Sequence, residues 1–418
     1  MQVRSLHFVF VGIVAMSLAV MVYPNDVAWA DETLDRLLDQ ATANNPTIAA
    51  AHRRWEAAMA EVPQARALDD PELSITQWSI PSNFNLSRTD ETWYGLSQAF
   101  PFPGKRRLRG RVAEAGAQAA EQDSYAAVRA IRARVKTTYA RLYRAQRNIA
   151  THLEHQALLQ ELIQIALARY GVGEAPQQES LKAQVELSSL HTSLLALEQE
   201  QQSLRIELNT VIGRPDDPLF FGTAQIAFAP ITPPVDALEA AAQEERPEIN
   251  AAGRMVAQQQ EAVALANRGF LPDFMAEVAY WDVHDGPNRW MAMGRMTLPW
   301  LAAGKYRAKI AQERAGLARA GAERDAARNE TSFLVRDLFL KIKTSEMLID
   351  LYRSGIIAQA EQALESARIA YTAGRADFLN LIDAEGRLRD VRLAADLALA
   401  DWAERRAELE RVVGRDIP

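Results

Sequence analysis

The sequence predicts a mainly α-helical protein with a small β part, in which two tandem copies follow one plan. Only 20 of the 418 residues are glycine and 18 are proline, while alanine, leucine, glutamate, glutamine and arginine are frequent, so the composition favours long helices. One offset brings the two halves of the chain into register. Each half also carries a helical pattern, over about 104–170 and 304–372, that would reach ~100 Å and suits a coiled coil or a helical tube rather than a globular core.

Matched proline, glycine and tyrosine residues establish the duplication, because alanine-rich helices alone would align at many offsets. Between the matched blocks the register slips by one residue, with Gly104-Lys105 facing Gly304-Lys305, as a change of loop length would produce. The matched pairs include Pro46 and Pro247, Pro71 and Pro272, Tyr170 and Tyr371, Gly173 and Gly374, Ala183 and Ala384, and Gly213 and Gly414.

The two copies share one order of parts: helix, strand, strand, long helix and returning helix. Residues 31–214 form the first copy and residues 235–418 the second, and the proline-rich residues 215–234 act as a linker or equatorial segment. The predicted helices cover about 32–68, 104–170 and 177–212, then 235–270, 304–372 and 377–413. The predicted strands cover about 72–80 and 92–100, then 273–281 and 290–298.

Residues 1–30 have the pattern of a signal peptide for export. Arg4 supplies a positive start, residues 8–22 are nearly all apolar, and Ala28-Trp29-Ala30 matches a small-x-small cleavage site. The alternative is an uncleaved anchor, which the short apolar run disfavours. The sequence has no cysteine, so we expect neither disulfides nor a lipid on an N-terminal cysteine. After residue 30 there is no run of eighteen apolar residues, so entry into a membrane requires β-strands.

The strand pairs alternate between two kinds of face. Phe274, Val278 and Tyr280 fall on one face of their strand, and Glu277 falls on the other, as Arg295 does in the partner strand. An apolar, aromatic-edged face opposite a small or polar one is typical of membrane barrel strands, and the alternative is a half-buried sheet in a soluble domain. Four strands cannot close a barrel, so the barrel interpretation requires several chains.

Two local motifs, each present in both copies, resemble the TolC-type outer-membrane factor family over nearly the whole mature chain. The first is the FPFPGKRR segment at 100–107, echoed by Leu298-Pro299-Trp300 and Gly304-Lys305, where a strand ends and a long helix begins. The second is the Tyr-x-x-Gly turn of Tyr170 and Gly173, repeated at Tyr371 and Gly374. The local likeness is greatest to the branch that serves cobalt–zinc–cadmium and copper–silver efflux.

The resemblance implies a homotrimer in the cell outer membrane. Three chains would form a twelve-stranded β-barrel, four strands per chain, continued by an α-helical tunnel through the periplasm. The helix turns would form the periplasmic tip, which docks a periplasmic adaptor (membrane fusion) protein serving an inner-membrane pump of the resistance-nodulation-division type. Glu277 and Arg295 would line the barrel lumen. The tip residues would be Tyr170, Gly173, Ala183, Tyr371, Gly374 and Ala384.

The resemblance also suggests gate residues after the second turn. In the family's best-known member, acidic residues stand six and nine positions after the glycine, where this chain has Asn380 and Asp383. Asp383 therefore matches the pattern and Asn380 departs from it. Asp377 would supply a carboxylate ring of its own in a trimer, with Arg375 as its ion-pair partner. The alternative for these charged residues is an ordinary solvated helix face.

Other patterns predict no catalytic or metal chemistry. Lys105, Arg106 and Arg107 would face lipid phosphates at the membrane rim, or would simply begin a helix with basic residues. His152 and His155 lie one helical turn apart without a third ligand, so we expect a surface pair. Met291 and Met293 share a strand face that Met296 does not, which favours packing over a soft-metal site. We expect no cofactor and no enzyme activity.

The predicted function is the exit duct of a tripartite efflux system, which passes substrates from an inner-membrane pump and a periplasmic adaptor to the exterior. Heavy-metal cations are the expected cargo. Within the family, a drug-efflux or protein-secretion duct is an alternative. A periplasmic adaptor or scaffold coiled coil is an alternative from a different class, but it would have one helical hairpin beside β-rich modules. The net charge of −7, with both signs mixed and no basic block, excludes a nucleic-acid partner.

Overall fold

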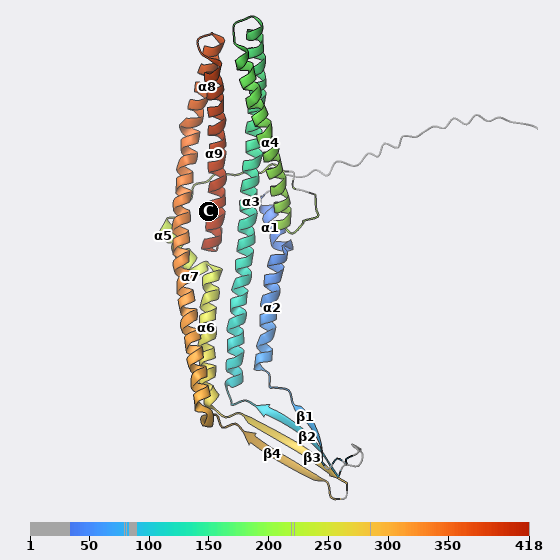
Figure 1. The fold of residues 1–418 in the computed structure, drawn as a ribbon. Coiled ribbons are helices and arrows are strands. Elements are labelled where there is room, and N and C mark those ends of the chain that lie inside the picture. The colour runs from blue at the N-terminus through green and yellow to red at the C-terminus, as the bar shows by residue number, and fades with distance from the viewer. Residues whose placement is uncertain are drawn as a thin grey trace, which may run out of the picture.

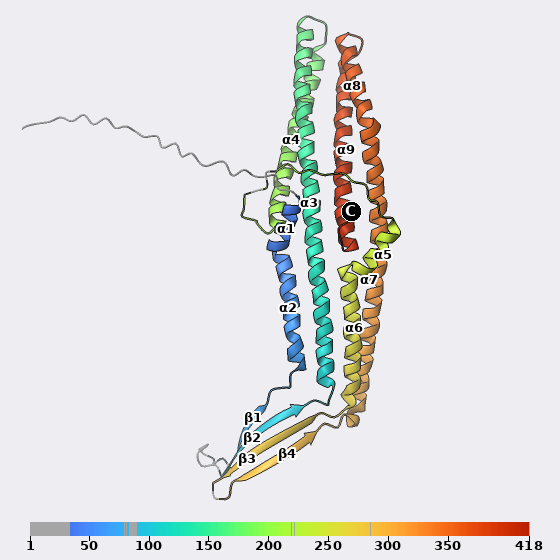
Figure 2. The same cartoon turned by 180° about the vertical axis from the view of Figure 1, so that it is seen from behind.

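The molecule is elongated, with long helices side by side along its length and a small inclined sheet at one end (Figure 1; Figure 2 shows it from behind). The structure, a computed structural model, describes residues 34–78, 80, 82, 90–218, 220, 222–284 and 286–417. The predicted signal peptide, residues 1–30, lies outside the described residues. None of the described helices combines the length and the apolar character needed to cross a lipid bilayer.

Both copies contain the predicted order of elements, which confirms the mainly α-helical fold with a small β part. The first copy comprises α1 (Leu34–Asn44), α2 (Pro46–Arg66), β1 (Glu72–Trp78), β2 (Glu91–Phe100), α3 (Lys105–Gly171) and α4 (Gln177–Val211). The second comprises α5 (Val235–Glu245), α6 (Pro247–Asn267), β3 (Phe274–Val283), β4 (Arg289–Met296), α7 (Ala303–Leu351), α8 (Ile357–Thr372) and α9 (Phe378–Val413). Short helical turns flank them: η2 (Arg268–Phe270), η3 (Pro299–Ala302) and the π-helical η4 (Tyr352–Ile356).

The first helix of each copy is broken in two, so the single helices expected over 32–68 and 235–270 are wrong. Asn45 and Arg246 precede Pro46 and Pro247 and have extended backbone conformations, which a residue before proline prefers. Each proline then fits the first turn of the next helix, where its missing N–H costs nothing. The Asn45 side chain also accepts a hydrogen bond from the Thr47 amide at 2.8 Å, which caps α2.

The long helix of the second copy is also interrupted, contrary to the continuous pattern expected over 304–372. The π-helical turn η4, Tyr352–Ile356, separates α7 from α8, whereas α3 runs for 67 residues as one α-helix. A π-turn inserts an extra residue into a helical ladder and thereby shifts the face that the helix presents beyond it. The two copies therefore differ in their long helices although their sequences align.

The four strands form one antiparallel sheet in the order β1-β2-β3-β4, and the β2–β3 pairing joins the two copies. In this register Leu96 stands opposite Val278, and Tyr94 stands opposite Tyr280. The predicted alternation is confirmed, because large exposed apolar side chains gather on one face of the sheet. They are Leu73, Ile75, Tyr94, Leu96, Phe100, Phe274, Val278, Trp290 and Met296.

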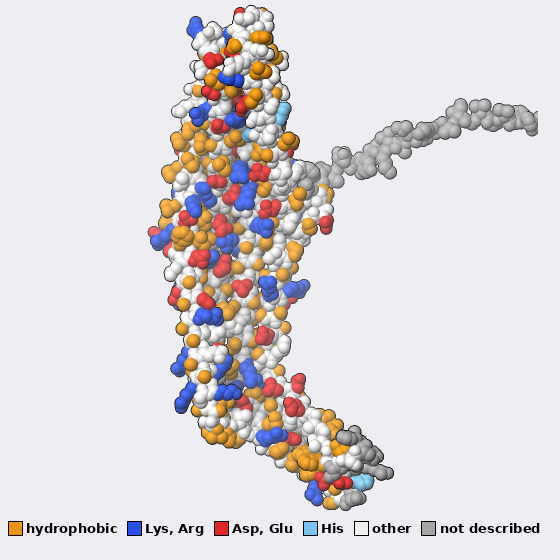
Figure 3. Space-filling view, in the orientation of Figure 1, with side chains coloured by type: hydrophobic (Ala, Val, Ile, Leu, Met, Phe, Trp, Pro, Cys, Tyr) orange, Lys and Arg blue, Asp and Glu red, His pale blue; other side chains and the backbone are white. Residues whose placement is uncertain are grey.

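Helix α3 is the central element of the helical part and packs against α2, α4, α6 and α9. The four helices α2, α3, α6 and α7 adjoin the sheet, and the hairpins α3–α4 and α8–α9 form the opposite end (Figure 1). Charged side chains of both signs are interspersed along this part of the surface (Figure 3). The linker packs on the middle of the molecule, where the Gln225 amide donates to the Tyr139 hydroxyl at 3.0 Å.

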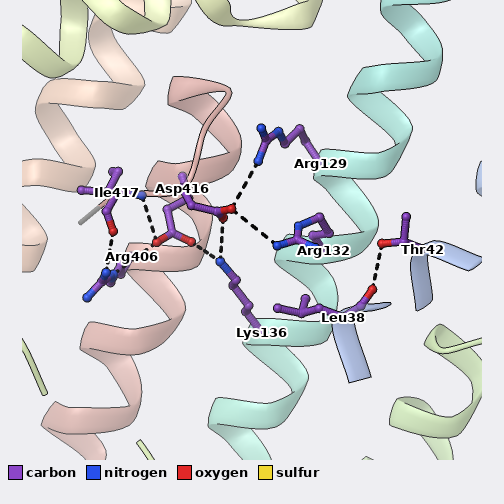
Figure 4. A network of polar contacts seen from close by, with 9 residues as sticks. Leu38, Thr42, Arg129, Arg132, Lys136, Arg406, Asp416 and Ile417 are labelled. Carbon is purple, nitrogen blue, oxygen red and sulfur yellow. Dashed lines mark hydrogen bonds and ion pairs between the residues drawn. The ribbon is translucent and has the colours of Figure 1, made fainter. Parts of the chain in front are cut away.

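An ionic network fixes the end of the chain to α3 in the same middle region (Figure 4). Asp416 lies 3.0 Å from the Lys136 ammonium and 3.5 Å from the Arg132 guanidinium, and Ile417 beside it is buried. Burial opposes ionisation of Asp416, but the hydrogen bond from Lys136 and the surrounding cations outweigh it and lower the pKa of this carboxyl. The network thus joins the last turn of the second copy to the first copy.

Candidate functional site

The two hairpin turns have the same backbone geometry, and glycine makes it accessible. Gly173 and Gly374 have φ values of 78° and 68°, in the left-handed region. Their amides donate to the carbonyls of Tyr170 and Tyr371, each at 3.0 Å. A Cβ at either glycine would meet no atom within 4 Å, so each turn needs its glycine for backbone conformation and not for space.

The tyrosines beside these turns are not equivalent, although the duplication aligns them. Tyr371 is 1% exposed, whereas Tyr170 is 46% exposed. The Tyr371 hydroxyl donates to the Glu179 carboxylate of α4 at 2.9 Å, and the Arg169 guanidinium of α3 lies over the Tyr371 ring at 4.7 Å. Burial and the bond to Glu179 raise the pKa of Tyr371. Tyr371 therefore links the second hairpin to the first.

An apolar cluster completes the contact between the two hairpins near their turns. Ala183 is fully buried in it, whereas Ala384 is half-buried outside it. Alanine at 183 leaves room for the second hairpin to approach α4 closely. The buried members are Leu162, Ile163, Ala166 and Ala183 of the first copy and Tyr371, Phe378 and Leu381 of the second.

The four gate candidates lie together around the start of α9, and all are exposed in this chain. Asp377 is the N-cap of α9 and accepts a hydrogen bond from the Leu379 amide at 3.4 Å. The expected ion pair between Arg375 and Asp377 does not occur in the described part of the chain, because the Asp377 carboxylate turns toward its own helix. Asn380 and Asp383 follow on the first turns of α9.

Lys105 is buried, so the prediction that it faces lipid phosphates is wrong. Its side chain is 7% exposed, and its ammonium donates to the Asp273 carboxylate and the Leu271 carbonyl, each at 2.8 Å. Asp273 also accepts from the Phe102 amide at 2.7 Å. The FPFPGK motif of the first copy therefore ties the end of β2 to the start of β3 in the other copy, because a buried ammonium requires such partners.

The neighbours of Lys105 remain at the surface. Arg106 is half-buried and donates twice to the Arg66 carbonyl, at 2.9 and 2.6 Å, which fixes α3 to the end of α2. Arg107 is exposed. Contact with lipid phosphates at the membrane rim therefore stays a prediction for Arg106 and Arg107, and Arg107 is the more exposed of the two.

The second face of the sheet carries polar and stacked aromatic groups. Glu277 is buried and forms an ion pair with Arg295 of the neighbouring strand. Trp93 stacks on Trp281 across the β2–β3 pair at a centroid distance of 5.7 Å. Glu277 and Arg295 thus share the face opposite the apolar one, as the strand alternation predicts.

The three strand methionines divide between the two faces as expected. Met293 stands opposite Glu277 and Met291 opposite Ala279 on the polar face, whereas Met296 stands opposite Phe274 on the apolar face. No group of three or more His, Asp or Glu side chains in the described ranges is placed to hold a metal ion.

His155 corrects the expectation of a surface histidine pair. Its side chain is 2% exposed and hydrogen-bonds to the Glu385 carboxyl group of α9, while His152 is half-buried one turn away. The sequence did contain a signal, because His155 shares a helix face with Leu159, Leu162 and Ala166 at spacings of three and four. Its partner Glu385 has the same kind of signal, because it shares a face of α9 with Phe378, Leu381 and Leu388 at spacings of three and four.

The fold and the tip define a class of protein: a duplicated unit of two helical hairpins with an amphipathic sheet at the opposite end. The sequence model of the outer membrane efflux protein family matches residues 37–214 and 238–415. The chain therefore belongs to the outer membrane efflux protein family. It is a transport channel protein of the outer membrane and not an enzyme.

Individual relatives are distant in sequence but similar along almost their whole length. The cobalt-zinc-cadmium resistance protein CzcC of Cupriavidus metallidurans is 22% identical over 95% of this chain and 93% of its own. The outer membrane protein TolC of Vibrio cholerae is 21% identical over 93% of this chain and 92% of its own. Among solved structures, VceC from Vibrio cholerae superposes with a TM-score of 0.77 and 20% identity, covering 92% of this chain and 97% of that one. CusC superposes equally well, at a TM-score of 0.77 and 17% identity, over 92% and 93% of the two chains.

Proposed function

We propose that three copies of this chain form the exit duct of a tripartite efflux system. In this proposal an inner-membrane pump delivers the substrate, a periplasmic adaptor joins the pump to the hairpin tips, and the three sheets close a twelve-stranded barrel in the outer membrane. The observation that carries the proposal is the open four-stranded sheet, which exposes a continuous apolar face and ends in two different edge strands, β1 and β4.

The unlike edges favour a closed ring of copies. A contact that joins β4 of one copy to β1 of the next is heterologous, and such contacts close when the rotation completes a circle. Twelve antiparallel strands is an even number within the range of outer-membrane barrels. Ring closure would also pair the backbone groups of both edge strands, which open sheets leave available for association.

Exposed apolar stripes on the helices support the same arrangement. On α7 they recur at Phe333, Leu340 and Met347, the seven-residue spacing of a coiled-coil seam. Helix α4 lies on the opposite side of the molecule from α7 in both views (Figures 1 and 2), and it exposes leucine, valine and isoleucine side chains. They are Leu181, Val185, Leu195 and Ile206. Large exposed apolar side chains on both α4 and α7, at opposite sides of the molecule, suit packing of α4 against α7 of the next copy.

The assembly is tested by fractionation and by size in mild detergent. We expect the protein in outer membranes, and a detergent particle with the mass of three chains. Leu340→Glu should shift the particle toward single chains, because a carboxylate in an apolar seam loses its hydration. Met255→Glu is the matched control, since Met255 is an exposed apolar side chain of α6 outside both stripes. A native particle of one chain would contradict the duct.

We propose heavy-metal cations as the cargo. The likeness to the cobalt-zinc-cadmium resistance protein supports this class, and the exposed carboxylates Asp377 and Asp383 at the tip would favour cations in a ring of three. The test is growth of a deletion strain on cobalt, zinc and cadmium salts, compared with copper and silver salts and with hydrophobic drugs. Sensitivity to drugs alone would replace the metal assignment with a drug-efflux duct.

A further inference from the structure

A buried polar cluster joins the two hairpins below their turns. His155 of α3 and Glu385 of α9 have side chains 2% and 5% exposed, and the imidazole Nδ1 is hydrogen-bonded to Glu385 Oε1. Arg389, one turn further along α9, places a guanidinium nitrogen 3.2 Å from His155 Nε2 and 3.1 Å from Glu186 of α4. Three helices from both copies therefore meet at one histidine.

The partners assign the proton on the imidazole. A guanidinium only donates, so Nε2 must accept from Arg389, and the single proton of a neutral imidazole then lies on Nδ1 and is donated to Glu385 Oε1. The other carboxyl oxygen, Oε2, is buried and has no hydrogen-bond partner among the described residues. A buried, unpartnered oxygen is costly as part of a carboxylate and less costly when it carries a proton.

We infer that the His155–Glu385 contact is a proton-dependent latch, which holds the second hairpin against the first while Glu385 is protonated and releases it when Glu385 ionises. The latch lies within a single chain and does not depend on assembly. Its consequence for the opening of a duct rests on the proposed function. The π-turn η4 gives the second hairpin a place to bend, since α8 begins directly after it, whereas α3 of the first hairpin is continuous.

Burial at the latch favours the neutral pair, whereas the charge of Arg389 favours a neutral His155 but an ionised Glu385. Burial and the Arg389 charge lower the pKa of His155 to about 4, and burial raises the pKa of Glu385 to about 8. Glu186 of α4 and Asp390 of α9 both pair with Arg389, at 3.1 and 3.0 Å.

Two further charged groups lie near the cluster. His152 lies one turn from His155 on α3. Arg392 of α9 is held at 2.8 Å by Glu154 of α3 and at 2.9 Å by Glu361 of α8. The bonds of Arg392 join α9 to both neighbouring helices, and its positive charge lowers the pKa of Glu385, against the larger effect of burial.

The pKa shifts of His155 and Glu385 determine the pH range in which the latch holds. The depressed pKa of His155 weakens the latch as pH falls from 6.5 toward 4, and the raised pKa of Glu385 weakens it as pH rises from 4.5 toward 8. Between pH 4.5 and 6.5 the two effects cancel. Above pH 6.5 only Glu385 remains, so the ratio of latched to released hairpins falls about 30-fold between pH 6.5 and 8.

The experiment measures the separation of the hairpins directly. The sequence has no cysteine, so cysteines introduced at Val172 and Ala373, which are exposed at the two turns, carry spin labels at defined sites. Labelled chains are diluted with unlabelled ones in detergent, so that each measured distance lies within one chain. We expect the longer-distance population to grow from pH 6.5 to 8.5 in the parent and to stay constant in Glu385→Gln, whose amide does not titrate.

Two comparisons make the outcome decisive. In His155→Gln the longer-distance population should grow from pH 4.5 upward, because the opposing titration of the imidazole is gone. Glu161→Gln, at an exposed position of α3, should behave like the parent. A pH response that persists in Glu385→Gln, or a parent without any response, would overturn the latch. Since the distances are read within one chain, a failed duct would show itself separately, as loss of the three-chain particle.

Discussion

Replacing Lys105 by methionine should destabilise the protein, because the ammonium of this lysine is buried and holds the two copies together. The change removes two hydrogen bonds of 2.8 Å, to Asp273 and to the Leu271 carbonyl, while keeping the length of the side chain. Hydrogen bonds to a charged group contribute roughly 1.5–3 kcal/mol each. Asp273 is 40% exposed and regains water, so the expected loss in the free energy of unfolding is about 2–3 kcal/mol.

The assay is chemical denaturation at a fixed protein concentration, since assembly makes stability concentration-dependent. Asp273→Asn keeps an acceptor for the Phe102 amide, so a double-mutant cycle with Lys105→Met should show a coupling of about 1–2 kcal/mol. Arg107→Met is the matched control: this exposed neighbour should change stability by less than about 0.5 kcal/mol. Equal effects of the two substitutions, or a coupling near zero, would refute the role assigned to Lys105.

Three further predictions concern the hairpin contact and two glycines with positive φ. Tyr371→Phe removes the hydroxyl that donates to Glu179 and should destabilise the contact between the two hairpins by about 1 kcal/mol. The longer-distance population of the spin labels should therefore grow, whereas Tyr170→Phe should leave it unchanged. Gly414→Ala should cost at least about 2 kcal/mol in denaturation, because φ is 88° and the new Cβ would lie 2.7 Å from the Glu245 carbonyl oxygen; Gly374→Ala, with open space around it, should cost about 1 kcal/mol. Ala183→Phe should overpack the hairpin contact by about 1–3 kcal/mol and separate the labelled turns, while circular dichroism keeps its helical signal.

Periodicity and turn residues predicted the elements and their order well, because these signals are local. The strands lie within two or three residues of their expected bounds, and both Tyr-x-x-Gly motifs form turns, with positive φ at their glycines. The break at Asn45-Pro46 was also predictable in principle. It was missed because the apolar pattern continues across it, although proline after an N-cap residue begins a helix.

Contacts between the copies could not be predicted in the same way. His155 and Glu385 lie 230 positions apart, and Lys105 and Asp273 lie 168 apart. A local pattern shows that a lysine begins a helix, but it does not show whether a carboxylate distant in the sequence forms an ion pair with that lysine. Tyr371 is buried and Tyr170 is exposed for the same reason, because the two aligned Tyr-x-x-Gly motifs have different neighbours in the folded chain.

The open sheet constrains the order in which a copy enters the membrane. β1 and β4 each have a neighbouring strand on one side only within the described chain, so the backbone N–H and C=O groups along their outer edges need partners other than a strand of this sheet. Hydrocarbon offers no water, and each unpaired group there costs several kcal/mol. For a ring of three copies, insertion and association are therefore one linked equilibrium, and the yield of inserted protein depends steeply on the concentration of free copies reaching the membrane surface.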